Sequence, residues 1–293
     1  MRWLLIIALV VAAGCHERVI ADSFDWESAP EVYPGVRHTS VVTNLPRRLS
    51  IQAVRIDLHV AGIGFEVTGR AEDWQMNQKE TSRETTRAFI ERLRTDGKPV
   101  ILAINANYYS PTGNEPGLAT LRGLAVSNGI LVSPSERNRR AFVITNDGVP
   151  QITNTGPDTD IDNSRHAVGG YVRLVNDGNL RGENNPSDIG PRTAIGHCRE
   201  SRYVIMLVID GRRPLHSIGT TMRETAEWLH YFGAWEAINL DGGGSSTMVW
   251  INPESGESEL LNIPSDQRMI LGIPAGGSIE RWVGCNIGIY LKK

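Results

Sequence analysis

Three Asx-Gly dipeptides, each between two apolar runs, constrain the fold of this chain more than any other feature. They are Asn128-Gly129, Asp147-Gly148 and Asp177-Gly178. Asn-Gly and Asp-Gly accept the backbone angles of a tight hairpin turn, so each dipeptide is expected to join two antiparallel strands. The sequence therefore predicts antiparallel pairing across roughly residues 120–182.

Hydrophobic periodicity predicts three further elements before this region. Apolar and polar residues alternate from Val54 to Val60, which is typical of a half-buried strand. A Thr81-x-x-Glu84 capping box precedes apolar residues at helical spacing, and Asp96-Gly97 is expected to end that helix. The apolar run from Val100 to Ile104 then predicts a buried strand.

The C-terminal part of the chain changes to a strand, helix, strand pattern. Tyr203–Ile209 is almost wholly apolar, Thr220 or Thr221 can cap a helix, and Ala237–Leu240 is a short strand. This order predicts a βαβ unit whose two strands are parallel neighbours. We therefore predict a single α+β domain with a mixed, largely antiparallel β-sheet, β-hairpins and one βαβ unit near the C-terminus.

The first fifteen residues resemble a bacterial export signal. Arg2 is followed by an apolar run and by the small residues 12–14, which precede Cys15. This pattern resembles a lipobox, in which Cys15 carries lipid; an ordinary signal peptide with an incidental cysteine is the alternative. The predicted division is a signal peptide over 1–14, a polar tether over 15–44 and the folded domain over 45–293. We expect an exported protein, lipid-anchored at the bacterial cell envelope (periplasm or outer membrane), that reaches the membrane through this anchor alone.

Charge and residue spacing bound the partners and cofactors. The formal net charge of -3 provides no basic footprint, so no nucleic-acid partner is expected. Cys198 and Cys285 form either a disulfide, as export permits, or two buried thiols. The Cys and His spacings match no zinc pattern. We expect no required cofactor, although the carboxylates and asparagines leave room for a divalent cation such as Ca²⁺ or Mg²⁺.

The most specific local feature is a strand that leads into three glycines and two serines, Asn239 to Ser246. Asp241 ends the strand, where open sheets often bind ligands. The backbone amides of Gly242–Gly244 could approach and bind an anion. The spacing is not that of a Walker loop, a dinucleotide loop or a hydrolase elbow, because Thr247 stands where the elbow has glycine. A tight turn capped by Asp241 is the alternative interpretation.

Three other positions add chemistry, each with a structural alternative. Asp210-Gly211 ends the preceding strand, and Asp210 could pair with Asp241 as carboxylates do in glycoside hydrolysis, although Asp-Gly is also a turn dipeptide. Arg192 suits two-point binding of a phosphate but could be a solvated surface group. Glu224 falls opposite the apolar face of its helix, so composition alone makes it a surface charge.

Taken together and in this order, the segments resemble the phosphodiester glycosidase family over roughly residues 45–293. The resemblance rests on Asn105–Tyr109, Arg192–His197, Asp210-Gly211, Glu224–Leu229, Ala237–Thr247, Ile263–Asp266 and Arg281. Residues 105–107 read Asn-Ala-Asn, whereas the family typically has Asn-Gly-Gly there. We expect Asn107 to affect which substrate is taken more than which reaction is performed.

The resemblance implies hydrolysis of a sugar-1-phosphodiester, part of a phosphorylated glycan or a smaller molecule, that releases the sugar and a phosphomonoester. Asp241 is the first candidate for the catalytic carboxylate, followed by Asp210 and Glu224. The expected substrate and phosphate contacts are Arg192, Thr193, Asn105, Asn107, Tyr109, Gly242, Gly243, Gly244, Ser245 and Ser246. Two alternatives remain: a non-enzymatic lipoprotein that binds phosphorylated envelope glycans, and a metal-dependent phosphodiesterase that cuts the P–O bond.

The predicted anchor can be tested by replacing Cys15 with serine. Cys15→Ser removes the acylated thiol, so we expect the protein to move from the membrane fraction to the soluble fraction. Fractionation of the wild-type and variant proteins checks this. A Cys15→Ser protein that still sediments with membranes would reject the anchor.

Overall fold

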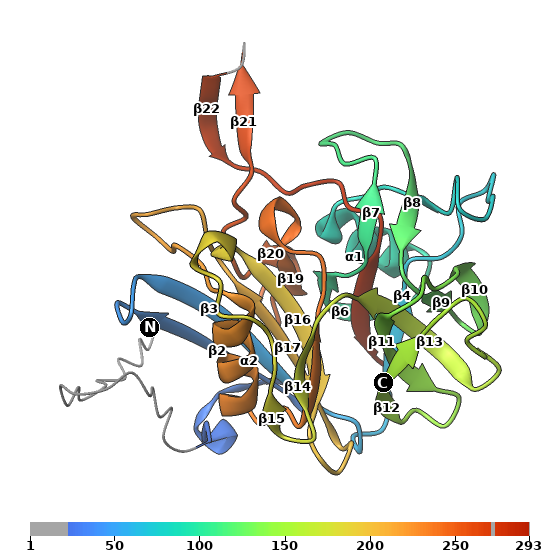
Figure 1. Ribbon diagram of the computed structural model, residues 1–293, viewed down its shortest axis with the longest axis horizontal. Coiled ribbons are helices and arrows are strands. Elements are labelled where there is room, and N and C mark those ends of the chain that lie inside the picture. The colour runs from blue at the N-terminus through green and yellow to red at the C-terminus, as the bar shows by residue number, and fades with distance from the viewer. Residues whose placement is uncertain (1–22, 271–272, 293) are drawn as a thin grey trace.

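The computed structural model describes residues 23–270 and 273–292, and it consists mainly of antiparallel β-sheet (Figure 1). Its described part contains two α-helices, α1 (Thr86–Thr95) and α2 (Met222–Tyr231). Neither these helices nor any other described helix is long and apolar enough to cross a membrane. The predicted signal peptide and Cys15 lie outside the described residues.

Two large sheets form the body of the molecule. The first has eight strands in the order β1 (Glu31–Tyr33), β2 (Val36–Thr43), β3 (Leu49–Asp57), β17 (Tyr203–Ile209), β16 (Arg192–His197), β18 (Glu236–Asn239), β14 (Arg173–Asn176) and β15 (Asn179–Leu180). The second has five, in the order β20 (Ser258–Leu260), β19 (Met248–Ile251), β6 (Val100–Asn105), β23 (Asn286–Leu291) and β4 (Ile63–Val67). Their facing sides bury one apolar core, to which both contribute, for example through Met206 and Ile104.

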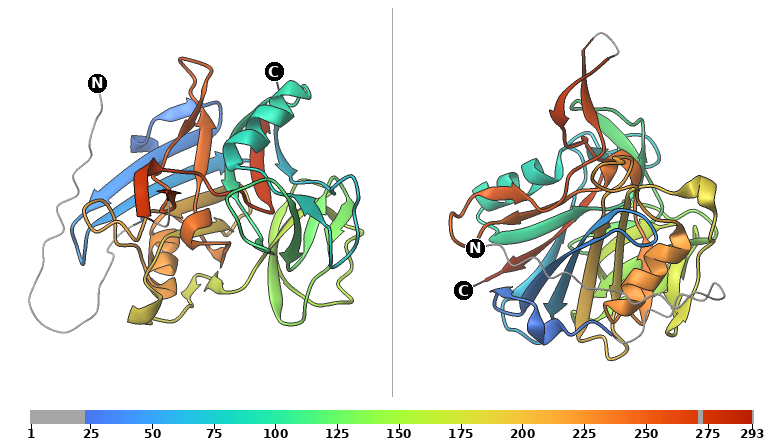
Figure 2. Two further views of the ribbon diagram at one scale, coloured as in Figure 1. Left: turned by 90° about the horizontal axis from the view of Figure 1, so that it is seen from above. Right: turned by 90° about the vertical axis from the view of Figure 1, so that its left-hand side faces the viewer.

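The remaining elements surround these two sheets. A third sheet has the order β10 (Ile130–Ser133), β9 (Ala125–Ser127), β13 (Ser164–Gly170), β11 (Arg139–Thr145) and β12 (Pro150–Thr155). Smaller units are the sheet of β5 (Thr81–Ser82), β8 (Leu118–Arg122) and β7 (Tyr108–Ser110), and the pair β21 (Gln267–Ile270) and β22 (Ile273–Ser278), which projects from the body (Figures 1 and 2). Three short 3-10 turns complete the elements: Trp26–Ser28, Pro186–Asp188 and Gly243–Ser245.

Each helix covers the outer face of one large sheet. In α2, Ala226 and Leu229 pack on the first sheet, on the side away from the second sheet. In α1, Phe89 and Leu93 pack on β6 and β19 of the second sheet. Burial of these apolar stripes holds the helices in place, since a short helix in water gains little stability from its own hydrogen bonds.

All three predicted hairpins are present. Asn128-Gly129 joins β9 to β10, Asp147-Gly148 lies between β11 and β12, and Asp177-Gly178 joins β14 to β15. Both residues of the first and third dipeptides have positive φ, between 49° and 78°, as a type I′ turn requires. The predicted antiparallel region is therefore confirmed.

The βαβ prediction is only partly correct. β17 and β18 run in the same direction, because each is antiparallel to β16. They are not neighbours, however, since β16 lies between them. β16 precedes β17 in the chain and pairs with one edge of each strand, while β3 pairs with the other edge of β17 and β14 with that of β18.

Two predicted boundaries in the first hundred residues are wrong. The polar tether does not extend to residue 44, because β2 pairs along its whole length with β3 and Trp26 is buried. The cap of α1 is Thr85, whose side chain accepts a hydrogen bond from the Ala88 amide, and Thr81 instead lies in β5. The strand predicted from Val54 to Val60 also differs from the observed β3. β3 begins at Leu49, and its residues through Val54 are buried on both faces.

One buried amide joins the two large sheets. Asn105, at the end of β6, donates from Nδ2 to the backbone oxygen of Asp241 at 2.6 Å. Its Oδ1 accepts from the Thr193 hydroxyl at 2.8 Å and from the Thr247 amide at 3.1 Å. Asp241 and Thr193 belong to the first sheet and its loops, whereas Thr247 immediately precedes β19 of the second.

Asn105→Ala should therefore destabilise the fold, because it leaves three buried polar groups without a partner. We expect a loss of roughly 2–4 kcal/mol in the free energy of unfolding. Urea unfolding, read as a lower midpoint at an unchanged slope, measures this loss. Asn146→Ala, which removes one exposed hydrogen bond to the Asp162 backbone, is the matched control. Equal midpoints for the two variants would contradict the assignment.

Candidate functional site

The candidate site lies where several strand ends of the first sheet meet the end of β6. β17 and β18 end at one edge of the sheet, and the antiparallel strands β16 and β14 begin there. Asp241 follows β18 at this edge, and its amide donates to the backbone oxygen of Ala106, just after β6, at 2.8 Å. Together with the bond from Asn105, this fixes the backbone of Asp241 at both its N–H and its C=O.

The Asp241 carboxyl is half-buried, and burial raises its pKa to about 6. The Ser245 side chain, the Arg281 guanidinium and the Gly242 amide act in the opposite direction, but burial outweighs them. A carboxyl with a pKa near neutrality can exchange a proton under physiological conditions, which is the property expected of a catalytic acid or base.

Two of the three glycines allow an arginine to approach the loop. A Cβ atom at Gly244 would lie 2.1 Å from both Arg281 and Asp266, which pair through two hydrogen bonds of 2.8 and 2.9 Å. A Cβ at Gly243, whose φ is +63°, would lie 3.0 Å from the guanidinium of Arg212. The Gly243 amide donates to the Pro191 oxygen, so it is not free to bind an anion as predicted.

Arg212 is the cation of this loop that the sequence did not single out. It is exposed, it follows β17, and its φ of +57° is unusual for a residue other than glycine. Its guanidinium makes no ion pair within the described part of the chain. The only sequence signal for Arg212 as a site residue is its position directly after Asp210-Gly211. An exposed arginine is otherwise indistinguishable from an ordinary surface group.

Arg192, the predicted phosphate ligand, is engaged by the protein. Its side chain is buried, Nε donates to the Thr220 oxygen at 2.9 Å, and the guanidinium forms an ion pair with Asp188 at 3.1 Å. It also donates to the Asp188 backbone oxygen. Its neighbour Thr193 gives its hydroxyl proton to Asn105. Both residues therefore shape the start of β16 beside the site rather than offer free ligand groups.

The Asp210 carboxylate is hydrogen-bonded within the protein through both oxygens and is not a second free acid. Its side chain is 1% exposed and accepts from Asn262 at 2.9 Å and from the Ile263 amide at 3.1 Å. Its other oxygen lies 2.7 Å from Nε2 of His216. Asn262 also donates to the Ser246 oxygen at 3.0 Å. Asp210 thus ties the segments after β17 and β20 to the glycine loop and carries no oxygen free for catalysis.

Glu224 caps its own helix. Its carboxylate accepts from the Thr221 amide at 3.0 Å, which completes a capping box with Thr221 as the N-cap, and it pairs with Arg47. The prediction that Glu224 is a surface charge is wrong, because its side chain is 12% exposed. These contacts also oppose the catalytic role proposed for it.

Asn107 is likewise structural. Its Nδ2 lies within 3.1–3.3 Å of the backbone oxygens of residues 122–124, and its Oδ1 accepts from the Gly169 amide at 3.0 Å. Both amide protons are therefore used by the protein, and the side chain is 1% exposed. The expectation that Asn107 contacts the substrate is not supported by this arrangement.

Two tyrosines and two serines border Asp241. The Tyr109 hydroxyl donates to the Trp282 oxygen at 2.6 Å, and burial raises its pKa to about 12. Tyr108, which sequence reasoning did not select, has its pKa raised by burial and by the charge of Asp241. Ser245 and Ser246 are buried, and the Ser245 side chain lies close enough to the Asp241 carboxyl to lower its pKa. Both hydroxyl oxygens are buried, and a substrate contact of either serine stays a prediction.

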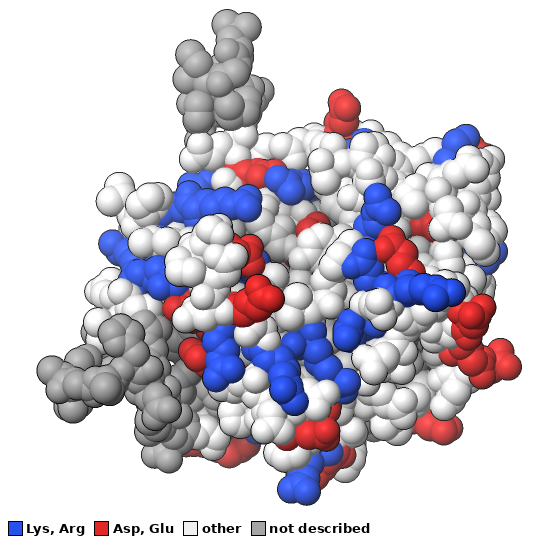
Figure 3. All heavy atoms as spheres, viewed as in Figure 1, with Lys and Arg blue, Asp and Glu red and all other residues white. Residues whose placement is uncertain are grey.

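The two buried cysteines, Cys198 and Cys285, are free thiols. Within the described residues, no cluster of three His, Cys, Asp or Glu side chains could hold a metal ion. On the face shown in Figure 3, Lys and Arg side chains gather in groups among Asp and Glu.

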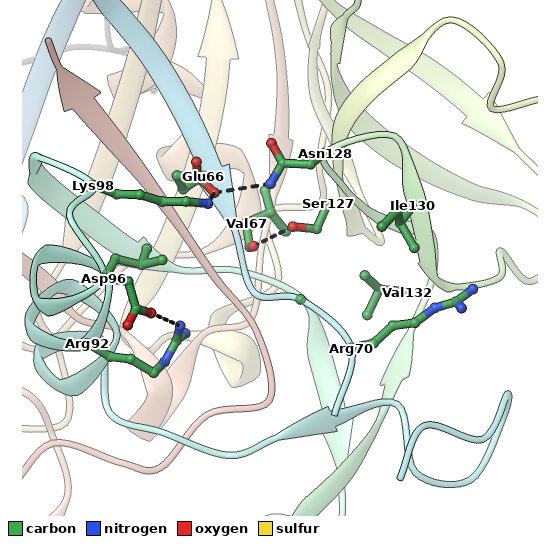
Figure 4. A pocket seen from close by; sticks show the side chains of 12 residues that line it. Glu66, Val67, Arg70, Arg92, Asp96, Lys98, Ser127, Asn128, Ile130 and Val132 are labelled. Carbon is green, nitrogen blue, oxygen red and sulfur yellow. Dashed lines mark hydrogen bonds and ion pairs between the residues drawn. The ribbon is translucent and has the colours of Figure 1, made fainter. Parts of the chain in front are cut away.

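A separate cavity of about 310 Å³ lies at the other end of β6 (Figure 4). Six residues of strand place it about 20 Å from the Asp241 end. Its polar groups satisfy one another: Glu66 pairs with Lys98 at 2.7 Å and accepts from Asn128 at 3.3 Å. Its buried carboxylate, Glu66, is paired with Lys98, whereas burial raises the pKa of Asp241, so we assign the chemistry to the Asp241 site.

Comparison with known proteins identifies what the chain is similar to. A family model described as phosphodiester glycosidase matches residues 98–290. No curated protein sequence matches the chain. Among solved structures, the catalytic domain of zebrafish N-acetylglucosamine-1-phosphodiester alpha-N-acetylglucosaminidase, auto-inhibited by its pro-peptide, aligns with a TM-score of 0.62 and 19% identity, covering 90% of this chain and 87% of that one.

Two bacterial structures are similar in fold as well. A protein of Synechocystis aligns with a TM-score of 0.58 and 14% identity, over 90% of this chain and 64% of that one. A protein of Burkholderia pseudomallei K96243 described as exported aligns with a TM-score of 0.53 and 15% identity, over 83% and 74% of the two chains. At these identities the structural likeness establishes the fold alone.

The raised pKa of Asp241 predicts a stability effect with a defined sign. Unfolding lowers this pKa from about 6 to the ordinary 3.8. The native state therefore loses stability as the pH rises from about 3.8 to about 6, and the full penalty is present above pH 6. Asp241→Asn should therefore raise the Tm at pH 8, and the gain should shrink at pH 5, where the native carboxyl is protonated.

Asp57→Asn is the control of opposite sign, because Arg202 lowers the pKa of Asp57 and the charge pair is lost. Thermal unfolding at both pH values compares the two variants. A Tm of Asp241→Asn below that of the wild type at pH 8 would contradict the assignment.

Proposed function

The chain belongs to the phosphodiester glycosidase family, and from this we propose that it hydrolyses the bond between the anomeric carbon of a sugar and a phosphodiester oxygen. Water adds to the anomeric carbon and the C–O bond to phosphate breaks. The products are the free sugar and a phosphomonoester, which keeps the bonding electrons and takes up a proton of the water. The half-buried Asp241 carboxyl, with its pKa of about 6, is the observation that carries the proposal.

One free carboxylate is enough for this chemistry. An ordinary glycosidase needs a second carboxyl to protonate the departing sugar alkoxide. A phosphomonoester has a second pKa near 6, so it leaves with little help from an acid. A mechanism with one free carboxylate agrees with the contacts of the other two candidates. Asp210 is bound by Asn262 and His216, and Glu224 is bound by Arg47.

Asp241 would act in its ionised form. In that state it can stabilise the positive charge that develops at the anomeric carbon, attack that carbon, or take a proton from water. Arg212, beside Gly243, would bind the phosphate charge, and the charge of Arg281 would help keep Asp241 ionised. An anchor at Cys15 would hold this site near phosphorylated glycans of the cell envelope.

The activity assay uses a panel of sugar-1-phosphodiesters and separates free sugar from sugar phosphate among the products. We expect free sugar, and kcat/KM should fall as the pH is lowered through about 6, because Asp241 becomes protonated. Asp241→Asn should lower kcat on the order of 10³-fold or more.

Asp57→Asn, at the far end of the first sheet, should leave kcat unchanged. A wild-type enzyme that binds such substrates without cleaving them would favour a glycan-binding protein. A rate that rises as the pH falls below 6 would assign Asp241 as an acid and reject the proposed role.

A further inference from the structure

The strand order places groups of different chemistry on the two sides of Asp241. Along the sheet edge, β17 ends at one side and the start of β16 follows. Next comes the end of β18, which Asp241 follows, and β14 begins at the other side. Neighbouring strands lie about 5 Å apart, so the β17 end lies about 10 Å from β18 and the β14 start about 5 Å from it. Arg212 follows β17, whereas Tyr171 precedes β14.

An aromatic pair occupies the β14 side. The rings of Tyr108 and Tyr171 meet edge to face with their centroids 4.8 Å apart. The Arg139 guanidinium lies 3.3 Å from the centroid of the Tyr171 ring. Tyr171 is 37% exposed, and Tyr108 is close enough to Asp241 to feel its charge. The pair therefore reaches from the carboxyl to the surface.

Asn239 holds both tyrosines in place from beneath. This buried residue, two positions before Asp241, donates from Nδ2 to the Tyr108 hydroxyl at 2.8 Å. Its Oδ1 accepts from the amide of Val172, the residue after Tyr171, at 2.5 Å. Because the Tyr108 oxygen already accepts this bond, its own proton is left to donate to another group. One amide thus sets the position of the aromatic pair relative to Asp241.

The charges differ between the two sides. Arg139, beside the tyrosines, is neutralised by Glu136 through a bond of 3.0 Å from Nε. Arg212 has no ion-pair partner within the described residues. A phosphate is expected to bind beside an uncompensated guanidinium. A sugar ring has an apolar C–H face and a hydroxyl edge, which match an aromatic ring and a phenol proton.

We propose that the substrate lies across Asp241 with its sugar against Tyr108 and Tyr171 and its phosphate against Arg212. This orientation rests on the proposed function, and it makes Tyr171 a residue that determines sugar specificity. The anomeric carbon, which joins the two halves of the substrate, then lies over the Asp241 carboxyl. The rest of the phosphodiester extends toward the loop of residues 212–219.

The test compares inhibition by the two halves of the substrate. With the best substrate of the panel, free sugar and inorganic phosphate are each titrated as inhibitors of the wild type and the variants. Tyr171→Ala should weaken inhibition by the sugar about fivefold and leave inhibition by phosphate unchanged. Arg212→Ala should weaken inhibition by phosphate about tenfold or more and leave inhibition by the sugar unchanged.

Trp74→Ala is the control, because Trp74 also stacks on an arginine, Arg70, but lies beside the distant cavity. Tyr171→Phe keeps the ring and should keep most of the sugar inhibition. The reversed pattern, equal loss of both inhibitors in each variant, or no loss in either variant would overturn the orientation. A wild-type protein that cleaves no glycosyl phosphodiester would instead reject the proposed function itself.

Discussion

The whole site depends on the buried Asn105 side chain, which joins the two large sheets beside Asp241. Its oxygen and nitrogen each have their partners inside the protein, and the residue is fully buried. An amide is required here because one group must both donate to Asp241 and accept from Thr193 and Thr247. In a low-dielectric interior such a network tolerates little displacement, since an unmade bond costs the full desolvation of its partner. The backbone of Asp241 is thereby held before any substrate arrives.

Several residues around Asp241 have environments or backbone angles that lower the stability of the fold. The Asp241 carboxyl is buried enough to raise its pKa, Arg212 has a positive φ, and the buried Ser246 hydroxyl has no hydrogen-bond partner within the described residues. Arrangements of this kind lower stability and are concentrated at functional sites. Glycine at position 244 belongs to the same group, because any side chain there would overlap the Arg281–Asp266 pair. The distant cavity beside Glu66 has its polar groups satisfied and shows no such concentration.

Local sequence signals predicted the turns correctly. They failed for features that depend on contacts between segments distant in the sequence. The three Asx-Gly hairpins are present because turn geometry is a property of a few residues. The position of β16 between β17 and β18 depends on pairing that no short pattern encodes. The same reason explains why Arg192 rather than Arg212 was predicted to bind phosphate. The sequence does not show that the fold places Asp188 beside Arg192. The asparagines behave similarly, since Asn107 reads as a ligand until its contacts with residues 122–124 are seen.

The central claim is that the bond to the anomeric carbon breaks while the phosphorus atom is left untouched, and the fate of water oxygen tests this most directly. Hydrolysis in ¹⁸O-labelled water, followed by mass spectrometry of the phosphomonoester, reports which bond was cut. Attack at the anomeric carbon leaves the phosphomonoester with only its original oxygens, and this is the result we predict. A phosphomonoester or sugar phosphate that carries one ¹⁸O atom would show attack at phosphorus and would contradict the role assigned to Asp241.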